Sequence, residues 1–497
     1  MKNRNKAWIL AILFLAGACV EDSGNYDYIP VDEIFPVEIS GLADTTFLLG
    51  TTVELHPEVK GLDSDLSKYD FVWYSFPISA TGYAPKRDTI GTTIDLSFFV
   101  TYQPGESRQL VFEIKEKSSG LAVIKKVKIV VTSAFSNGWF IVNDINDQTD
   151  VDFINTNGVI HEDIISLVSG QKLQGKGVKI AFQSSGYYHD KIMPDGTLSR
   201  LVNQSVFHVM SENDLKTLNA SSLEVYKNWE DEFFSPPAVK KPRDIITNYL
   251  GYVYLINDGR LHSIMGMTAG PGKFAYQKIG GEGIYPCILI GDFAQNATVF
   301  SNTTSSFLAE NMMNLQEVVS GSTGTPAVNM ECDVLWMERR VRMYTVTCAA
   351  WAITRSKTQP YEYHLLDIDA YGAENPIIDR HLLDPAARVL SADVYGVHPE
   401  HSAAFYFAKG NLLSYFQKGD SSGDDEVNLY TFSAGEIISY IGKNPTTSNL
   451  EVLTNANNTW KLYIFALANG GQYPYIDGPD PLTVYSGNGN ARYLIYR

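Results

Sequence analysis

The sequence predicts an all-β protein built from a small β-sandwich followed by a β-propeller. Three observations support this prediction. The chain is rich in aromatic residues and glycine, with 60 of the former and 39 of the latter, and few windows show sustained helical periodicity. Short apolar runs alternate with polar or Gly/Pro turns over most of the length. Many of the later runs are apolar at consecutive positions, which is typical of strands buried on both faces.

The N-terminus is predicted to be a lipoprotein signal peptide over residues 1–18. Three basic residues come first, and an apolar run of about ten residues follows, too short to span a bilayer as a helix but suited to the apolar region of a signal peptide. Residues 16–19 are Ala-Gly-Ala-Cys and resemble a lipobox. We therefore predict cleavage before Cys19 and lipid attachment to that residue. The alternative is an ordinary secretory peptide that leaves a free cysteine.

An acidic tether is predicted over residues 19–35. Its acidic pair, Glu21 and Asp22, resembles the export signal that sends some lipoproteins to the outer face of the outer membrane. The formal net charge is −17, and the loss of three positive charges with residues 1–18 takes it to −20. A chain this acidic repels phosphate backbones, which argues against nucleic acid as a partner. The predicted membrane contact is therefore the lipid anchor, with the protein facing the cell exterior.

Residues 36–133 are predicted to form an Ig-like β-sandwich. Polar or Gly/Pro turns separate the apolar runs at the spacing expected of an all-β domain. Trp73 is placed like the core tryptophan of Ig-like sandwiches. The predicted strands are Val37–Leu42, Thr46–Leu48, Val53–Val59, Asp70–Ser75, Ile94–Val100, Gln109–Lys115 and Leu121–Thr132.

Residues 134–497 are predicted to form a β-propeller. The hairpin turn at Gly259 resembles the turn at Gly410, and the two glycines lie 151 residues apart, which is three periods of about fifty. At that period the domain holds seven blades, with eight as the alternative. We also expect the terminal strand at 492–497 to close the ring against the first blade, which begins near Trp139.

Cys332 and Cys348 flank a predicted hairpin, with strands at 333–337 and 341–347 and a turn at 338–340. In that register the two cysteines face each other. A cross-strand disulfide suits an oxidising compartment, and a pair of buried free thiols is the alternative. The cysteine spacing matches no zinc motif.

Three short motifs suggest chemistry that their context argues against. Gly419–Gly423 matches Gly-x-Ser-x-Gly, but an acidic stretch follows where a serine hydrolase has a helix. His398 and His401 are three positions apart rather than four, and Pro399 disfavours a helix there. The acidic loop Asp144–Asp152 could hold calcium, but it lacks the central glycine and final glutamate of an EF-hand, so a solvated turn is favoured. We therefore predict no catalytic residues, no metal site and no cofactor, with calcium at the acidic loop as the alternative.

Aromatic clusters in predicted loops are the candidate ligand contacts. Flat aromatic faces beside amides and carboxylates suit sugar rings or peptides. Loops also carry much of the binding function of rigid scaffolds. The candidates are Tyr187, Tyr188, Trp229, Tyr473 and Tyr475.

The order of these features resembles the PKD-like family of bacterial surface lipoproteins. The resemblance rests on the lipobox, Asn25–Tyr28, Val53–Pro57, Phe71–Trp73 and Gly138–Val142, and it extends over most of the chain. Members of that family are typically encoded beside Sus-like outer-membrane nutrient uptake systems, and no catalytic residues are established for them. The resemblance thus implies a PKD-like sandwich, a propeller-like domain and a role at the cell surface.

Three functional hypotheses follow. The leading one is a non-catalytic surface protein, in which the sandwich is a spacer and the propeller binds a nutrient polymer (glycan or peptide) or a neighbouring uptake component. The first alternative is a propeller glycosidase or lyase with carboxylates near the central channel. The second alternative is a structural adhesion protein. Paired acids in the channel would favour the enzyme, whereas an exposed aromatic shelf would favour the binding protein.

Overall fold

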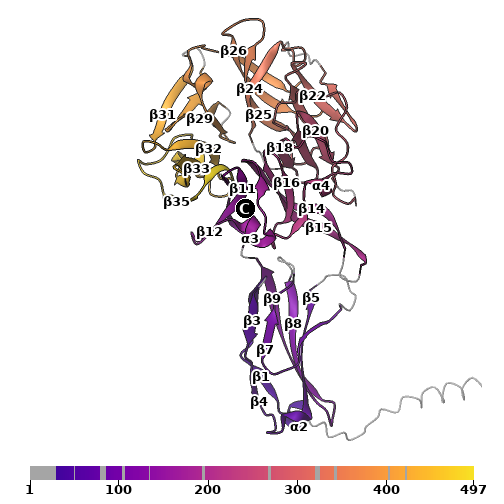
Figure 1. Ribbon diagram of the computed structural model, residues 1–497. Coiled ribbons are helices and arrows are strands. Elements are labelled where there is room, and N and C mark those ends of the chain that lie inside the picture. Colours follow the sequence, from indigo (N-terminus) through magenta and orange to yellow (C-terminus); the bar gives the residue numbers. More distant parts are fainter. Residues whose placement is uncertain are drawn as a thin grey trace, which may run out of the picture. The chain divides into compact units, whose positions relative to one another are not determined.

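The structure is a computed structural model that describes residues 30–49, 51–78, 86–102, 107–133, 135–192, 196–266, 270–319, 325–340, 344–400, 403–419 and 423–497. The predicted signal peptide and Cys19 lie outside these residues. The chain divides into two compact units, Met1–Thr132 and Ser133–Arg497 (Figure 1). None of the helices in the described ranges has the length and apolar composition needed to span a bilayer.

Unit 1 is a β-sandwich built around Trp73. This side chain is fully buried, its ring stacks on Phe112 with centroids 4.3 Å apart, and its Nε1 donates to the carbonyl of Thr93 at 2.9 Å. One sheet has the order β2-β9-β8-β5-β6, and the ladders β1-β4 and β3-β7 complete the unit. The elements are α2 (Val31–Ile34), β1 (Glu38–Ser40), β2 (Thr45–Leu48), β3 (Thr52–Leu55), β4 (Glu58–Lys60), η1 (Leu66–Lys68), β5 (Tyr69–Pro77), β6 (Asp88–Gly91), β7 (Leu96–Phe99), β8 (Ser107–Glu116) and β9 (Ala122–Thr132).

One strand that the sequence predicts in unit 1 is two strands in the structure. The prediction has a single strand over Val53–Val59, whereas β3 pairs with β7 and β4 pairs with β1. Pro57 lies at the break and has no N–H to donate to a ladder. The chain therefore changes partners at this residue.

Unit 2 is a β-propeller whose sheets follow one another along the chain (Figure 1). The described residues form seven sheets, the number that seven blades require, and the blade count itself stays a prediction. We number these sheets 1 to 7 in chain order. Sheet 1 contains β10 (Gly138–Ile145), β11 (Gln148–Asn155), β12 (Ile160–His161), β13 (Leu173–Gln174) and β36 (Asn490–Tyr496). Sheet 2 contains β14 (Gly177–Ile192), β15 (Leu198–Ser211), β16 (Leu215–Asn219) and β17 (Val225–Lys227).

Sheets 3 and 4 have three strands each: β18 (Pro242–Thr247), β19 (Val253–Asn257) and β20 (Arg260–Ile264), then β21 (Thr298–Ser301), β22 (Ser306–Asn311) and β23 (Asn314–Glu317). Sheet 5 contains β24 (Cys332–Arg339), β25 (Cys348–Ser356), β26 (Tyr363–Ala370) and β27 (Ile377–Leu383). Sheet 6 contains β28 (Val394–Val397), β29 (Ala404–Lys409), β30 (Leu412–Gln417) and β31 (Asp425–Thr431). Sheet 7 contains β32 (Ile437–Lys443), β33 (Leu450–Ala456), β34 (Thr459–Phe465) and β35 (Thr483–Asn488). The short helices are α3 (Ile164–Ser169), α4 (Trp229–Glu232), η2 (Arg388–Ser391) and α5 (Ala468–Gly471).

Alternate side chains of one strand contact two different neighbouring sheets. In β29, the ring of Phe405 lies 4.9 Å from Trp336 and 6.1 Å from Trp351 of sheet 5. The next residue, Tyr406, packs instead in the apolar cluster shared by sheets 6 and 7. Successive side chains of a strand point to opposite faces, so a sheet that is covered on both faces is apolar at every position. This arrangement explains the continuous apolar runs in the sequence.

Strand β36 closes the ring by pairing with β10. Trp139 lies opposite Tyr496 in this ladder, and Arg492 Nε donates to Oδ2 of Asp144 at 2.6 Å. The C-terminus accordingly lies beside β11 in Figure 1. These contacts confirm the prediction that the terminal strand pairs with the strand near Trp139.

The weak sequence repeat also has a structural counterpart. Gly259 lies between β19 and β20, and Gly410 lies between β29 and β30, which are the second and third strands of sheets 3 and 6. Both residues have positive φ, 69° and 59°, a conformation that glycine adopts without strain. The two turns are three sheets apart, in agreement with three periods of the repeat.

Candidate functional site

The predicted aromatic ligand contacts divide into buried and exposed residues. Tyr187 and Trp229 are each only 1% exposed, so the prediction that they present open faces is wrong. The Tyr187 hydroxyl donates to the carbonyl of Gly272 at 3.1 Å, and the Trp229 ring packs 5.0 Å from Phe233. Burying so large an apolar area stabilises the fold, even where the ring lies next to a loop.

The other three predicted contacts keep some exposure. Tyr473 and Tyr475 are 47% and 42% exposed, and their rings stack with centroids 5.9 Å apart. Tyr188 is half-buried and lines a cavity of about 210 Å³ together with Phe234 and Met265. A ligand contact at these residues stays a prediction.

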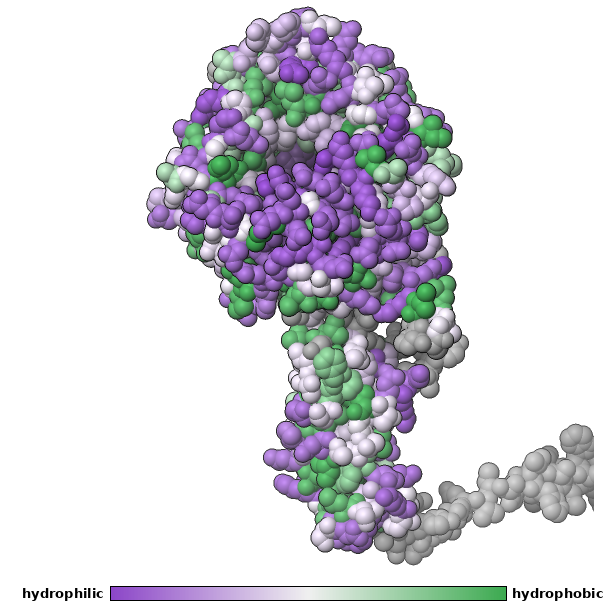
Figure 2. All heavy atoms as spheres, in the orientation of Figure 1, coloured by the Kyte–Doolittle hydropathy of each residue, from purple (hydrophilic) through white to green (hydrophobic). Residues whose placement is uncertain are grey.

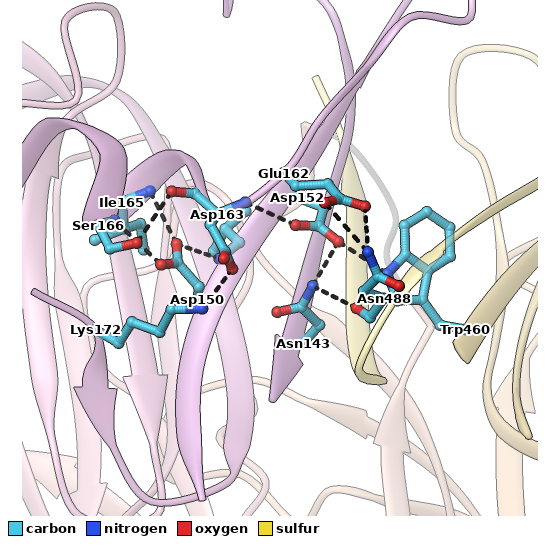
Figure 3. Close-up of polar contacts among 11 residues, drawn as sticks. Asn143, Asp150, Asp152, Glu162, Asp163, Ile165, Ser166, Lys172, Trp460 and Asn488 are labelled. Carbon is cyan, nitrogen blue, oxygen red and sulfur yellow. Dashed lines mark hydrogen bonds and ion pairs between the residues drawn. The ribbon is translucent and has the colours of Figure 1, made fainter. Parts of the chain in front are cut away.

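The carboxylates of the acidic hairpin between β10 and β11 are hydrogen-bonded within the protein (Figure 3). Asp150 accepts from the backbone N–H of Ile165, in α3, at 2.9 Å. Asp152 accepts from the N–H of Asp163 at 2.9 Å and from Nε1 of Trp460 at 2.8 Å. Burial raises the pKa of Asp152 to about 7. The acids therefore tie α3 and sheet 7 to sheet 1.

The hairpin has the predicted solvated turn at its tip, where Asn146–Gln148 are exposed, but three acids on its two strands are buried. Asp144, Asp150 and Asp152 are 3%, 0% and 1% exposed, because their oxygens accept hydrogen bonds from neighbouring elements instead of water. Within the described ranges, no three or more His, Cys, Asp or Glu side chains form a group that could hold a metal ion. Calcium at this hairpin stays a prediction.

The predicted register of the hairpin between the cysteines is wrong. Strand β24 continues through Glu338 and Arg339, which the sequence places in a turn, and it pairs Cys332 with Ser356. Cys348 begins β25, so the two cysteines lie at opposite ends of the ladder. Both thiols are buried and free. Charged residues such as Glu338 and Arg339 favour a solvent-exposed turn. The structure instead places both in β24, where they line a cavity among the sheets of unit 2.

The serine and histidine motifs are only partly described. Ser421 and His401 lie outside the described residues. His398 is fully buried, and its ring lies 6.1 Å from that of Tyr406. The expectation that these motifs are not catalytic stays a prediction.

A cavity of about 330 Å³ lies among the end strands of six sheets of unit 2. The face of the molecule in Figure 2 is hollowed near the centre of unit 2, with mostly hydrophilic residues below the hollow and several hydrophobic residues above it. We call this space the central cavity. Its charged lining residues are Lys179, Arg243, Asp244, Glu338, Arg339 and Arg492.

Two of the four cations of the central cavity are paired with acids. Lys179 Nζ lies 2.5 Å from Oδ1 of Asp244, whose other oxygen accepts from the N–H of Ile288 at 3.0 Å. Burial would lower the pKa of Lys179, but the neighbouring Asp244 holds this pKa above its ordinary value. Arg492 is paired with Asp144 at 2.6 Å.

The other two cations have weaker partners. Arg243 donates to the carbonyl of Pro242 and Arg339 to that of Ile290, each at 3.4 Å. Across the described part of the chain, neither arginine forms an ion pair with an acidic side chain. Glu338 lies beside them, and burial raises its pKa to about 7 although Lys179 and Arg339 act in the opposite direction.

Aromatic rings form the rest of the cavity wall. Trp336 stacks on Tyr395 with centroids 4.6 Å apart, and Tyr440 meets Tyr493 edge to face at 5.3 Å. The central cavity therefore combines cations, two carboxyl groups and flat apolar surfaces.

A second feature is a cluster of exposed rings, Tyr249, Phe293 and Tyr344, which we call the aromatic shelf. Their exposed fractions are 59%, 37% and 68%, and their centroids lie 5.1 to 6.3 Å apart. Asp292 joins the three loops: its carbonyl accepts from the N–H of Tyr249 at 3.1 Å, and its Oδ2 accepts from the N–H of Tyr344 at 2.7 Å. The shelf thus has a defined backbone support.

A groove of about 480 Å³ adjoins the shelf at Phe293. Its lining includes the exposed side chains of Tyr371 and Val346 and the polar groups of Gln295 and Glu374. Apolar faces and hydrogen-bonding groups therefore lie side by side on this surface.

The aromatic shelf and the central cavity are absent from the sequence-based predictions. The shelf rings come from loops of sheets 3, 4 and 5 and recur at roughly the fifty-residue period of the propeller. The cavity residues likewise come from successive sheets. The fifty-residue period is therefore the sequence signal that both sets of residues share.

A model of the PKD-like family matches residues 19–177. This match covers the described residues of unit 1 and extends to the first residue of β14. No curated protein matches the chain.

Several solved structures are similar. One is a quinonprotein alcohol dehydrogenase-like protein from Bacteroides thetaiotaomicron, with 10% identity, a TM-score of 0.40, and coverage of 92% of this chain and 96% of that chain. The Dos1 propeller has 10% identity, a TM-score of 0.36, and coverage of 72% and 89%. PorZ, a surface component of the type-IX secretion system of Porphyromonas gingivalis, has 9% identity, a TM-score of 0.18, and coverage of 86% and 58%.

Proposed function

We propose that this chain is a non-catalytic, lipid-anchored protein of the outer-membrane surface that binds a nutrient polymer on the aromatic shelf. The observation that carries the proposal is the gathering of three exposed rings from three successive sheets. The lipobox-like residues 16–19 and the acidic pair behind them support the location. The resemblance to lipoproteins of Sus-like uptake systems supports a role in nutrient capture beside an uptake complex.

The chemistry of the shelf favours a glycan over a peptide. Exposed aromatic rings gathered in one place mark interaction surfaces, because apolar area in water is unfavourable. Sugar rings present apolar C–H faces to aromatic rings and hydroxyl groups to amides and carboxylates. Gln295, Asn296 and Glu374 supply such polar groups along the adjoining groove.

The proposal is tested with a glycan and peptide array probed by residues 23–497, followed by product analysis of every ligand that binds. We expect binding to a glycan without turnover. The double variant Tyr249→Ala/Tyr344→Ala should weaken that binding by about tenfold or more, since two stacking faces are lost. The matched control is Tyr276→Ala, an equally exposed tyrosine (66%) outside the shelf. Equal losses in the control and in the double variant would refute the shelf as the binding site.

The enzyme hypothesis keeps one specific observation in its favour. Glu338, whose pKa is raised to about 7, and Asp244 both line the central cavity, and a carboxyl group that is protonated near neutral pH suits general acid catalysis. Turnover of an array ligand, abolished in Glu338→Gln, would support a glycosidase or lyase and contradict the non-catalytic proposal.

A further inference from the structure

The central cavity is rich in positive charge although the chain is strongly acidic. Its lining holds four cations, and the acids that face or pair with them are Asp244, Glu338 and Asp144, whereas the whole chain has a net charge of −17. We propose that the central cavity binds a small oxyanion, with Arg243 and Arg339 as the receiving cations. None of the shelf residues lines this cavity, so the inference does not depend on the proposed function.

The pairing of charges identifies the two receiving arginines. Lys179 and Arg492 already have carboxylate partners at 2.5 and 2.6 Å. Arg243 and Arg339 have carbonyl contacts at 3.4 Å, which is long for a hydrogen bond. Each guanidinium group therefore has donors to spare.

An oxyanion is the ligand group that matches spare guanidinium donors. The planar guanidinium presents paired N–H groups to carboxylate, sulfate or phosphate oxygens, and charge-assisted bonds of this kind are about twice as strong as neutral ones. A partly enclosed cavity strengthens the interaction further, because water screens the charges less. A neutral sugar would leave both positive charges without compensation.

The size and the walls of the cavity limit the ligand to a small molecule. Its volume is about 330 Å³, enough for a free inorganic anion or for one acidic sugar residue. The rings of Trp336, Tyr395, Tyr440 and Tyr493 offer flat surfaces beside the arginines. The shared chemistry is the oxyanion, and its source is either a free ion or an organic acid.

Glu338 gives the site a characteristic pH dependence. It faces Lys179 and Arg339, together with Tyr285 and Tyr440. Burial raises the pKa values of both tyrosines, and the pKa of Lys179 is also raised, so these groups keep their charge states between pH 6 and 8. Protonation of Glu338 removes a negative charge from the wall, and anion binding should therefore strengthen as the pH falls through 7.

Intrinsic tryptophan fluorescence of residues 23–497 provides the test, since Trp336 lines the cavity. Sodium sulfate, sodium phosphate and sodium glucuronate are titrated at constant ionic strength, with glucose as the neutral probe. We expect at least one anion to bind with a Kd below about 1 mM and glucose to give no saturable change. Sulfate or phosphate alone would identify a free ion as the ligand, and glucuronate alone would identify an organic acid.

Four variants locate the site. Arg243→Gln and Arg339→Gln should each weaken anion binding by about tenfold, since one charge-assisted contact is lost. Arg355→Gln, on the exposed side of β25, is the matched control and should bind like the unmodified chain. Circular dichroism and thermal unfolding verify that each variant is folded, and Arg243→Lys, which keeps the charge, should retain part of the affinity.

The results separate this inference from the proposed function. For sulfate, the affinity of the unmodified chain should rise from pH 8 to pH 6, and that of Glu338→Gln should be high at both pH values. Binding of no anion, or equal binding by the arginine variants and the Arg355→Gln control, overturns the oxyanion site. The shelf variant Tyr249→Ala/Tyr344→Ala should bind anions normally, so a failed glycan array leaves the cavity proposal standing, and the reverse also holds.

Discussion

Unit 2 places charged side chains in two contrasting regions, the acidic hairpin of sheet 1, where they are fully buried, and the central cavity, where Arg243 and Arg339 are half-buried. In the hairpin, Asp150 accepts a hydrogen bond from the backbone N–H of Ile165 in α3. Asp152 accepts hydrogen bonds from the N–H of Asp163, the residue before α3, and from Nε1 of Trp460. In the cavity, Arg243 and Arg339 are half-buried, and their guanidinium groups contact the carbonyl oxygens of Pro242 and Ile290 at 3.4 Å. Buried polar groups are normally satisfied. A satisfied buried charge therefore indicates a structural role, whereas half-buried guanidinium groups keep donors that solvent or a ligand can use.

The largest effect expected from this comparison concerns stability. Asp150→Ala should lower the free energy of unfolding of unit 2 by about 2–4 kcal/mol, because buried N–H groups at the start of α3 lose their acceptor. Urea unfolding followed by tryptophan fluorescence measures the change. Arg243→Gln is the matched control and should change stability by less than about 1 kcal/mol. Similar losses in both variants would remove the distinction between the two regions.

A smaller effect concerns pH. The pKa of Glu338 rises from 4.5 to about 7 on folding, so its protonated form is favoured in the folded state. The resulting stabilisation is complete below pH 4.5 and is lost as the pH rises through 7. Glu338→Gln should therefore stabilise the chain at pH 9, by about 1–3 kcal/mol, and much less at pH 5.

Thermal unfolding at both pH values measures this difference. Glu374→Gln, an exposed carboxyl beside the groove, should show no such dependence. If the difference in stability between Glu338→Gln and the unmodified chain is the same at both pH values, the carboxyl group is not desolvated in the cavity.

The smallest effect concerns calcium. Because the oxygens of Asp144, Asp150 and Asp152 already accept hydrogen bonds, 1 mM calcium should shift the melting temperature by less than about 1 °C relative to a chelator. Differential scanning calorimetry measures the shift. A rise of several degrees would instead support calcium binding by the acidic hairpin.

Sequence patterns predicted the features that depend on local or periodic signals. Trp73 indicated the sandwich core, the turns at Gly259 and Gly410 indicated the repeat, and the strand near Trp139 indicated the ring closure. Each of these signals is carried by residues that are neighbours in the sequence or that recur with a fixed period.

The candidate sites could not be predicted in the same way. Tyr187 and Trp229 are aromatic residues near loops, and composition alone does not show which rings the fold buries. The charges of Glu338 and Arg339 favour a turn, because only the neighbouring sheets make a charged strand end part of a cavity wall. The shelf rings are brought together by three separate loops, so no single window contains the site.

The closure of the ring by β36 also has a kinetic consequence. Arg492 and Asp144, which are paired at 2.6 Å, are 348 positions apart in the chain, and contacts of such high sequence separation form slowly because a long loop must first be closed. Until β36 arrives, β10 presents an unpaired edge that can pair with other chains. The interval between the arrival of β10 and that of β36 is therefore the period in which folding unit 2 is at greatest risk of aggregation.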